Sequence, residues 1–333
     1  MAQSLAARVV TVNTADNADP TGNALTSLLE ALQGLQDGDT IQFNIPGAGP
    51  HLIKTPLGGY PLITASNVVI DGYSQPGATA NTHGILEGNN ANLQIYLDSS
   101  DPELTGDPSL PTGHSTRLTD YSGYGDSENA ILGLLGASHV RLKGLGFLSH
   151  LTSGETEDPA IYCVALINGS EDCRVQGCRF GLDPDGHTLR GSAAAVAAFR
   201  FSGDDGPVYS SGLVFGTDGD GTDDVKEFNI TVGMHIALAI ELPHARISGN
   251  YFNVLADGKT FVDVNQIHGD LLATGRSGSD ASVENMENGR EMEGTIIGTD
   301  GDGVSDANER NIFNTVAYDH FVEFYSGAAD GLV

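Results

Sequence analysis

The chain repeats short segments of its own sequence, and this repetition limits its possible folds more than any other feature. Residues 174–180 (RVQGCRF) are matched by residues 246–252 (RISGNYF), and the eight residues after each segment keep the same spacing. Two shorter copies, starting at Gly212 and Thr295, each continue into Gly-Thr-Asp-Gly-Asp-Gly. Such a short unit, rich in strand formers and lacking a helix, cannot bury its own apolar side and must stack on its neighbours. The repetition therefore predicts a β-solenoid.

Large apolar residues mark the interval of this repeat. Successive anchors lie 33, 35, 37 and 45 residues apart. The anchors are Phe147, Phe180, Phe215, Phe252 and Ile297. The varying interval indicates loops of different length that project from a constant coil.

Residues 24–36 form the one convincing helical pattern, because leucines recur there at three- and four-residue steps and Gly38 follows. The rest reads as short β-type runs broken by Gly, Asn, Asp and Pro. These runs are Thr40–Ile45, Leu62–Ile70, Leu93–Leu97, Val140–Phe147 and Ile161–Ile167. We predict an N-terminal unit over residues 1–39, whose helix caps the coil, and a solenoid over residues 40–333. Polar stretches near 99–129 and 269–294 are predicted to be loop insertions.

The charge balance narrows the range of partners. The chain of 333 residues has 15 basic and 44 acidic side chains, a formal charge of −29. Nucleic acid and anionic membrane surfaces both require clustered basic residues, so neither is expected as a partner. No apolar run approaches the roughly 20 residues of a membrane span. The C-terminal stretch shows no capping pattern, which predicts self-association or a further domain at that end.

Several segments resemble one family of solenoids. Residues 51–53, 61–64 and 69–77 (VIDGYSQPG) are similar to the N-terminal part of secreted right-handed parallel β-helix proteins of the pectin-lyase-like superfamily. The Gly-Asn-Tyr-Phe and Gly-Thr-Asp segments are similar to its coils. The resemblance implies an all-β, right-handed parallel β-helix and a secreted or cell-surface location. It does not select an activity, because the superfamily includes lyases, glycosidases, esterases, tailspikes and adhesins.

Histidines and carboxylates in comparable segments of the later repeats are the candidate catalytic groups. In stacked coils, such positions would form a polar stripe on one face. The candidates are Asp263, His268, Asp270, His235, His320 and Glu323, with Arg276, Tyr318 and Lys259 as candidate substrate-binding residues. Carboxylates one or two strand spacings apart would match the pairs used in glycoside hydrolysis. A solvated, outward-facing residue is the alternative for each of them.

Aspartates recur in three Gly-rich turns and are the candidate metal ligands. Oxygen ligands on tight turns suit calcium, although the spacing does not match an EF-hand loop. The metal candidates are Asp218, Asp220 and Asp224 in one turn and Asp300, Asp302 and Asp306 in another, with Asp183 and Asp185 assigned to the same place in a third copy. The alternative is that Asp and Gly only shape the turns. No cofactor other than structural calcium is expected, since no loop has the residues of a phosphate cradle.

Three cysteines that lie close together in the chain, Cys163, Cys173 and Cys178, are too few for a zinc site and are predicted to be buried. The resemblance, the two loop insertions and the candidate polar stripe together favour a secreted carbohydrate-active protein that cleaves a polysaccharide by a glycosidase or lyase reaction. The alternative is a non-enzymatic acidic surface, adhesin or structural module, stiffened by calcium.

Overall fold

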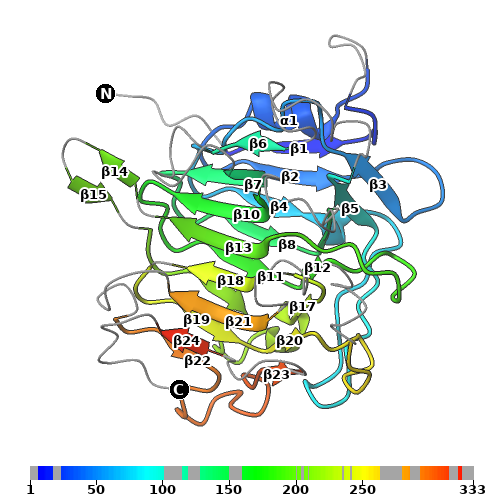
Figure 1. The fold of residues 1–333 in the computed structure, drawn as a ribbon. Coiled ribbons are helices and arrows are strands. Elements are labelled where there is room, and N and C mark those ends of the chain that lie inside the picture. The colour runs from blue at the N-terminus through cyan, green and yellow to red at the C-terminus, as the bar shows by residue number, and fades with distance from the viewer. Residues whose placement is uncertain are drawn as a thin grey trace, which may run out of the picture.

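Three sheets wind around one apolar interior, and strands that follow one another in the chain fall in sheets A, B and C in turn (Figure 1). The structure is a computed structural model. It describes residues 7–17, 24–100, 115–118, 128–149, 160–199, 201–203, 206–208, 210–234, 236–240, 242–262, 280–285, 293–314 and 322–324. Strand pairing within the three sheets is parallel except at β6, which runs antiparallel to β7. The fold is therefore the predicted parallel β-solenoid.

Sheets A and B take one strand from every coil, and sheet C takes one from every coil after the first; β1 in sheet A and β6 in sheet C are additional strands. Sheet A contains β1 (Val9–Val12), β2 (Thr40–Phe43), β4 (Val69–Asp71), β8 (Arg141–Lys143), β11 (Arg174–Gln176), β16 (Val214–Gly216), β19 (Arg246–Ser248) and β22 (Ile296–Ile297). Sheet B contains β3 (His51–Lys54), β5 (Ile95–Asp98), β9 (Leu145–Leu148), β12 (Arg179–Phe180), β17 (Asn229–Thr231), β20 (Asn250–Phe252) and β23 (Ile312–Phe313). Sheet C contains β6 (Thr116–Arg117), β7 (Glu128–Leu135), β10 (Ala160–Ile167), β13 (Ala194–Phe199), β18 (Ile236–Ile240), β21 (Asp280–Asn285) and β24 (Val322–Phe324).

We number the coils from the N-terminus. Coil 1 contains β2 and β3 and meets sheet C through a bridge between Ile63 and Leu134. Coils 2 to 7 contain, in order, β4-β5-β7, β8-β9-β10, β11-β12-β13, β16-β17-β18, β19-β20-β21 and β22-β23-β24. A separate antiparallel hairpin, β14 (Phe201–Gly203) with β15 (Gly206–Val208), projects between coils 4 and 5.

A residue in the left-handed conformation precedes each strand of sheet A except β1 and aligns successive coils. Seven residues with φ between 51° and 84° stand two positions before these strands. They are Gly38, Asn67, His139, Asp172, Gly212, His244 and Gly294. Each of the first six donates its N–H to a carbonyl of the following coil at 2.8 to 3.0 Å. Gly, Asn, Asp and His are the residues that tolerate this conformation best, so the sequence is locally suited to the turn.

The bend from sheet A to sheet B is as short as one residue. Gly144, Gly177 and Gly249 make it with φ between 62° and 68°. Coils 5 and 7 have longer connections here, and an asparagine where each reaches sheet B bonds to the preceding coil. Asn229 accepts from the N–H of Cys178 at 2.8 Å, and Asn311 accepts from the N–H of Asn250 at 3.0 Å. The predicted run Val140–Phe147 is therefore two strands, β8 and β9, because Gly144 turns the chain in its middle.

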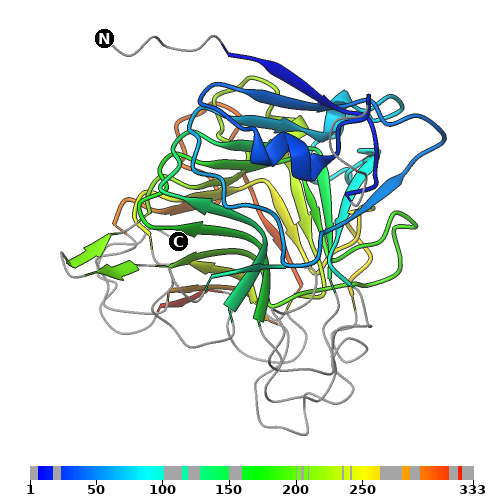
Figure 2. The same cartoon turned by 90° about the horizontal axis from the view of Figure 1, so that it is seen from above.

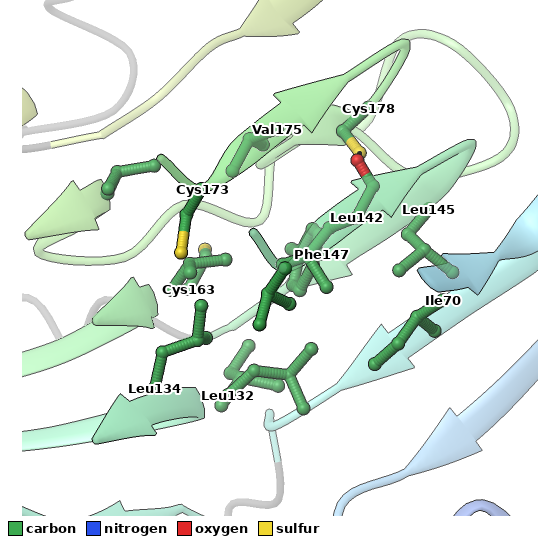
Figure 3. Packing of buried hydrophobic residues seen from close by; sticks show 14 of the residues in the cluster. Ile70, Leu132, Leu134, Leu142, Leu145, Phe147, Cys163, Cys173, Val175 and Cys178 are labelled. Atoms are coloured by element: carbon green, nitrogen blue, oxygen red, sulfur yellow. Dashed lines mark hydrogen bonds between the residues drawn. The ribbon is translucent and has the colours of Figure 1, made fainter. Parts of the chain in front are cut away.

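A stack of phenylalanine rings fills the interior from coil 3 to coil 7. The neighbouring rings are Phe147, Phe180, Phe215, Phe252 and Phe313, with centroids 4.8 to 6.3 Å apart. Figure 3 shows the side chain of Phe147, the first ring of the stack, among aliphatic side chains such as Leu142 and Leu134 from neighbouring strands. Four of the five predicted anchors belong to it, and Phe313 rather than Ile297 completes it.

The same stack corrects the predicted alignment of the repeats. Phe215 lies in β16 of sheet A, whereas Phe180 and Phe252 lie in sheet B, where coil 5 has Thr231 instead. Phe215 reaches the stack from the neighbouring sheet and supplies the ring that coil 5 lacks in sheet B. Phe180 and Phe215 therefore both contribute a ring to the core, but the segments that contain them lie in different sheets of the coil.

The N-terminal end is closed by α1 (Leu28–Gln33), which lies across the coil in Figure 2. Leu28, Ala31 and Leu32 are buried in the main core, and β1 adds one strand to sheet A. The helix is shorter than the predicted 24–36, because Ser27 begins it with a capping box to Glu30 and Leu25 is 44% exposed. None of the helices in the described ranges has the length and hydropathy to span a bilayer.

Phe180→Ala tests the ring stack. The change removes a buried ring between Phe147 and Phe215, so we expect the free energy of unfolding to fall by about 3–5 kcal/mol. The measurement is urea denaturation followed by circular dichroism. Phe261→Ala is the matched control, because that ring is 58% exposed and its loss should change stability by about 0.5 kcal/mol or less. Equal effects of the two changes would contradict the stack as a source of stability.

Candidate functional site

Most of the predicted catalytic residues lie outside the part of the chain that the structure describes. They are Asp263, His268, Asp270, His235 and His320, together with the substrate-binding candidates Arg276 and Tyr318. These assignments stay predictions. Of the catalytic and substrate-binding candidates, the structure describes Lys259 and the backbone of Glu323, which lie in different coils.

Glu323 stands in register with a second glutamate. It lies in β24 of coil 7, and the backbone pairing places it directly opposite Glu284 of β21 in coil 6. Glu284 is not among the predicted site residues. The Val-Glu pairs at 283–284 and 322–323 are the sequence signal that points to it, since both valines are also in register.

The backbone register places both glutamates at the end of one column of aligned positions in sheet C. The preceding strands place Ala239, Ala197, Ala165 and Gly133 at the same register position. Ala239 packs in a separate cluster with Ala165 and Ala197, whereas its neighbours Leu238 and Ile240 belong to the main interior. The column therefore changes from small residues to two successive carboxylates at coils 6 and 7.

Two carboxylates in register can divide the roles of acid and base. Neighbouring strands lie about 4.8 Å apart, which is close to the separation of roughly 5–5.5 Å between the carboxyl groups of retaining glycosidases. In general, like charges at this spacing disfavour the ionisation of both groups of a pair. A protonated and an ionised carboxyl group are the pair that cleavage of a glycosidic bond requires.

Lys259 lies in an exposed turn that follows β20 of sheet B. Its N–H donates to the carboxylate of Asp257 at 2.9 Å, and Thr260 donates to the same carboxylate. A matching turn follows β12, where Asp185 accepts from the N–H of His187 and from Thr188. The hydrogen bond from the Thr188 hydroxyl is the largest of the effects that lower the pKa of Asp185 to about 2.

This second turn corrects the assignment of Asp183 and Asp185 to the metal candidates. Both follow sheet B, whereas the other two Asp-rich turns follow sheet A after β16 and β22. Asp183 instead forms an ion pair with Arg190 at 3.0 Å. Two copies of the acidic turn remain, and we call residues 217–227 acidic loop 1 and residues 299–309 acidic loop 2.

The two acidic loops repeat one another at the same place in the coil, two coils apart. In each loop, three aspartates bring one carboxylate oxygen each to within 4.8 Å of the others. They are Asp218, Asp220 and Asp224 in acidic loop 1, and Asp300, Asp302 and Asp306 in acidic loop 2. Calcium binds six to eight oxygens at about 2.3–2.6 Å, so these donors fit that ion in type and spacing.

The same carboxylates also hold the turns together. Asp224 accepts from the hydroxyl of Thr217 and the N–H of Gly221, both at 3.0 Å. Asp302 accepts from the N–H of Val304 at 2.7 Å. These bonds support the alternative in which Asp and Gly shape the loops. They leave lone pairs on the carboxylates, so the turn-forming role and cation binding are compatible.

Arginines of sheet A lie beneath both acidic loops. Arg174 forms an ion pair with Asp218, and Arg141 forms one with Glu227 at 3.0 Å. In the second copy, Arg246 contacts both Asp300 and Glu309 at 2.7 Å. Glu227 and Glu309 are not among the predicted site residues, although each ends its loop at the same sequence separation from the aspartates.

The two loops are also packed against each other. Gly219 of acidic loop 1 has a φ of 69°, and a Cβ atom placed on it would come within 2.2 Å of both Arg246 Nη2 and Glu309 Oε1. A glycine is required there because the ion pair of acidic loop 2 occupies the space of a side chain. The loops therefore form one acidic surface over coils 5 to 7.

The cysteines lie where the sequence predicts them. Cys163, Cys173 and Cys178 are free and buried in the main core, where Figure 3 shows them among aliphatic side chains. Burial raises the pKa of Cys173 to about 11 and the pKa of Cys163 and Cys178 to about 12. These thiols therefore remain protonated at neutral pH and are unsuited to act as nucleophiles or metal ligands.

Glu227→Gln tests the electrostatics of acidic loop 1. Burial, and then the charge of Asp218, raise the pKa of Glu227 to about 7, above its usual value of 4.5. The folded state therefore binds this proton more tightly than the unfolded state, so its contribution to stability is present below pH 4.5 and is lost as the pH rises through 7.

The measurement is the free energy of unfolding from about pH 4.5 to pH 8 for wild type and variant. We expect the wild type to lose more stability over this range than Glu227→Gln. The exposed Glu171→Gln is the control and should follow the wild type. Parallel curves for wild type and Glu227→Gln would show that Glu227 titrates in its usual range.

Comparison with known proteins does not assign the chain to a family. None of the family models searched matches the chain, and no curated protein matches it with significance.

Proposed function

We propose that this protein is a secreted, carbohydrate-active member of the pectin-lyase-like β-helix proteins and that it hydrolyses an extracellular polysaccharide. The observation that carries the proposal is the register of Glu284 and Glu323 on adjacent strands of sheet C. Hydrolysis is favoured over elimination because the pair consists of two carboxylates, whereas a lyase needs a base and cations that neutralise a uronate. A net charge of −29 further favours a neutral polymer over an anionic one.

In the proposed reaction, one glutamate is protonated and donates its proton to the glycosidic oxygen as the bond breaks. The other is ionised and attacks the anomeric carbon, which gives a covalent intermediate that water then hydrolyses. The separation of one strand spacing favours this retaining course, because an inverting pair needs about 6.5–9.5 Å to admit a water molecule. The other catalytic candidates remain Asp263, His268, Asp270, His235 and His320, and the candidates for substrate binding remain Arg276, Tyr318 and Lys259.

Glu284→Gln and Glu323→Gln test the catalytic pair. The protein is incubated with a panel of neutral and acidic polysaccharides, and the products are identified by mass spectrometry. We expect hydrated oligosaccharides from a neutral polymer and a fall in kcat of about 10²–10⁴ in each variant, because each removes an acid–base or nucleophilic group.

Glu171→Gln, which changes an exposed glutamate before β11, is the matched control and should keep full activity. Thermal denaturation of all three variants checks that they fold. Full turnover in both catalytic variants would exclude the pair, and unsaturated products would show a lyase reaction instead.

A second function is favoured by the acidic loops: a non-enzymatic surface or structural module that calcium stiffens. Its specific support is the convergence of three carboxylates in each of two stacked loops. In this function Asp218, Asp220 and Asp224 hold one ion, and Asp300, Asp302 and Asp306 hold another. Each ion would neutralise the loop that holds it and so reduce the repulsion between the two loops. A well-folded protein that releases no product from any polymer would favour this function over hydrolysis.

Calcium titration tests the loops independently of activity. A ligand that binds only the folded state adds about 2.7 kcal/mol at 100 times its Kd, so calcium should raise the Tm of the wild type. The double change Asp220→Asn and Asp302→Asn should abolish most of this rise, because it removes one ligand charge from each loop. Magnesium and sodium chloride at equal ionic strength are the controls for screening. A Tm that neither calcium nor a chelator moves would mean that the aspartates only shape the turns.

A further inference from the structure

One connection from sheet A to sheet B is far longer than its counterparts and runs along the molecule instead of turning at once. It joins η1 (Gly72–Ser74) to β5 in coil 2, where coil 3 makes the same turn with Gly144. We call residues 78–94 the strap. In Figure 1 it is the cyan trace that descends beside β12 and β17 to β20.

The strap is a structured hairpin. Thr79 and Asn92 exchange two backbone hydrogen bonds at its base, at 2.9 and 3.0 Å. Further out, the side chain of Asn81 accepts from the N–H of Asn90 at 2.9 Å. The side chain of Asn90 in turn accepts from the N–H of Thr82 at the same distance. These bonds fix the course of the strap before it reaches the later coils.

Coils 4 and 5 are tied to the strap by side chains that donate to backbone carbonyls. Arg179 of coil 4 donates to the carbonyl of Ala91 at 3.2 Å. Asn81 and Asn89 of the strap donate to coil 5, at Val225 (2.7 Å) and Phe228 (3.3 Å). Asn81 is 1% exposed, so loss of its bonds would leave a buried polar group unsatisfied.

Coil 6 holds the tip of the strap. The hydroxyl of Tyr251 donates to the carbonyl of Ile85 at 2.5 Å, and the N–H of Asn89 donates to Ala256 at 2.6 Å. The side chain of Ile85 is buried in a small cluster that includes Tyr251 and Phe228 and is separate from the main interior. The strap therefore links coil 2 directly to coil 6, across the three coils between them.

These contacts oppose the usual behaviour of a solenoid. In such folds each repeat contacts only its neighbours, so terminal repeats can open while the rest stays folded. We propose that the strap couples coils 2 to 6 directly, so that they unfold as one cooperative unit, and that without it coils 5 and 6 open on their own. The proposal is independent of any catalytic function.

Hydrogen–deuterium exchange of the full chain, read by mass spectrometry, tests the coupling. The double change Asn81→Ala and Asn89→Ala removes the polar contacts of the strap with coil 5. We expect amides of β17 and β20 to exchange about tenfold faster than in wild type, while those of β8 and β9 change by less than about twofold. Tyr251→Phe removes one hydroxyl contact and should show the same pattern to a smaller extent.

Two controls separate coupling from simple loss of stability. Leu86→Ala lies in the strap but is 63% exposed, and it should leave exchange unchanged. Ile247→Val weakens the core of coil 6 with the strap intact, and it should accelerate β8 and β20 by the same factor. If the double variant also accelerates β8 and β20 equally, or if the wild type already exchanges coil by coil, the strap does not couple the coils.

Discussion

Backbone hydrogen bonding between successive coils is the constraint on which the rest of this structure depends. A short strand in a parallel sheet has no partner within its own coil, so its N–H and C=O groups are satisfied only if the next coil repeats its path. The turn before sheet A secures that repetition, since residues such as Asn67, His139 and Asp172 each donate to the coil that follows. The phenylalanine stack then fills the interior from coil to coil. Where coil 5 has Thr231 in sheet B, Phe215 from sheet A maintains the stack.

Register also determines the chemistry of the outer faces. Identical positions on successive strands lie one above another, so a residue type that recurs at one position becomes a row. On sheet C this brings Glu284 and Glu323 together although they are distant in the chain. On sheet A it places Arg141 and Arg174 in one row, where they meet the carboxylates of acidic loop 1. In a protein with 44 acidic and 15 basic side chains, three arginines thus pair with the carboxylates of the two acidic loops.

The sequence predicts the architecture well because the physics of a solenoid is local. Repetition, turn formers and the leucine pattern near residue 28 each act over a few residues, and all point to the same fold. The alignment of the repeats is harder to predict than the fold, because core residues can occupy equivalent places in space without occupying equivalent places in the repeat. Phe215 and Phe180 share a ring stack while lying in different sheets, and the pattern alone cannot distinguish those arrangements. The grouping of Asp183 with the acidic loops is wrong for the same reason.

Site residues depend on register to a single position. Sequence patterns miss Glu284 because its alignment with Glu323 depends on the lengths of the segments between them. The repeated Val-Glu pair identifies Glu284 only once that alignment is known. Sequence patterns miss Glu227 and Glu309 because the role of each comes from arginines in other coils, not from the turn that contains it. The predicted candidates at positions 263, 268, 270, 235 and 320 lie outside the described ranges, so the pair at 284 and 323 carries the chemical argument.

Disulfide cross-linking of Glu284→Cys with Glu323→Cys tests that register most directly. Neighbouring strands bring Cα atoms within the range of about 4.4–6.8 Å that a disulfide spans, so mild oxidation should yield a peptide linking positions 284 and 323. The three native thiols are buried and protonated, so they should stay unreacted. Glu284→Cys with Phe324→Cys, one position out of register, should link far less. Equal linking in both pairs, or none at 284 and 323, would contradict the account.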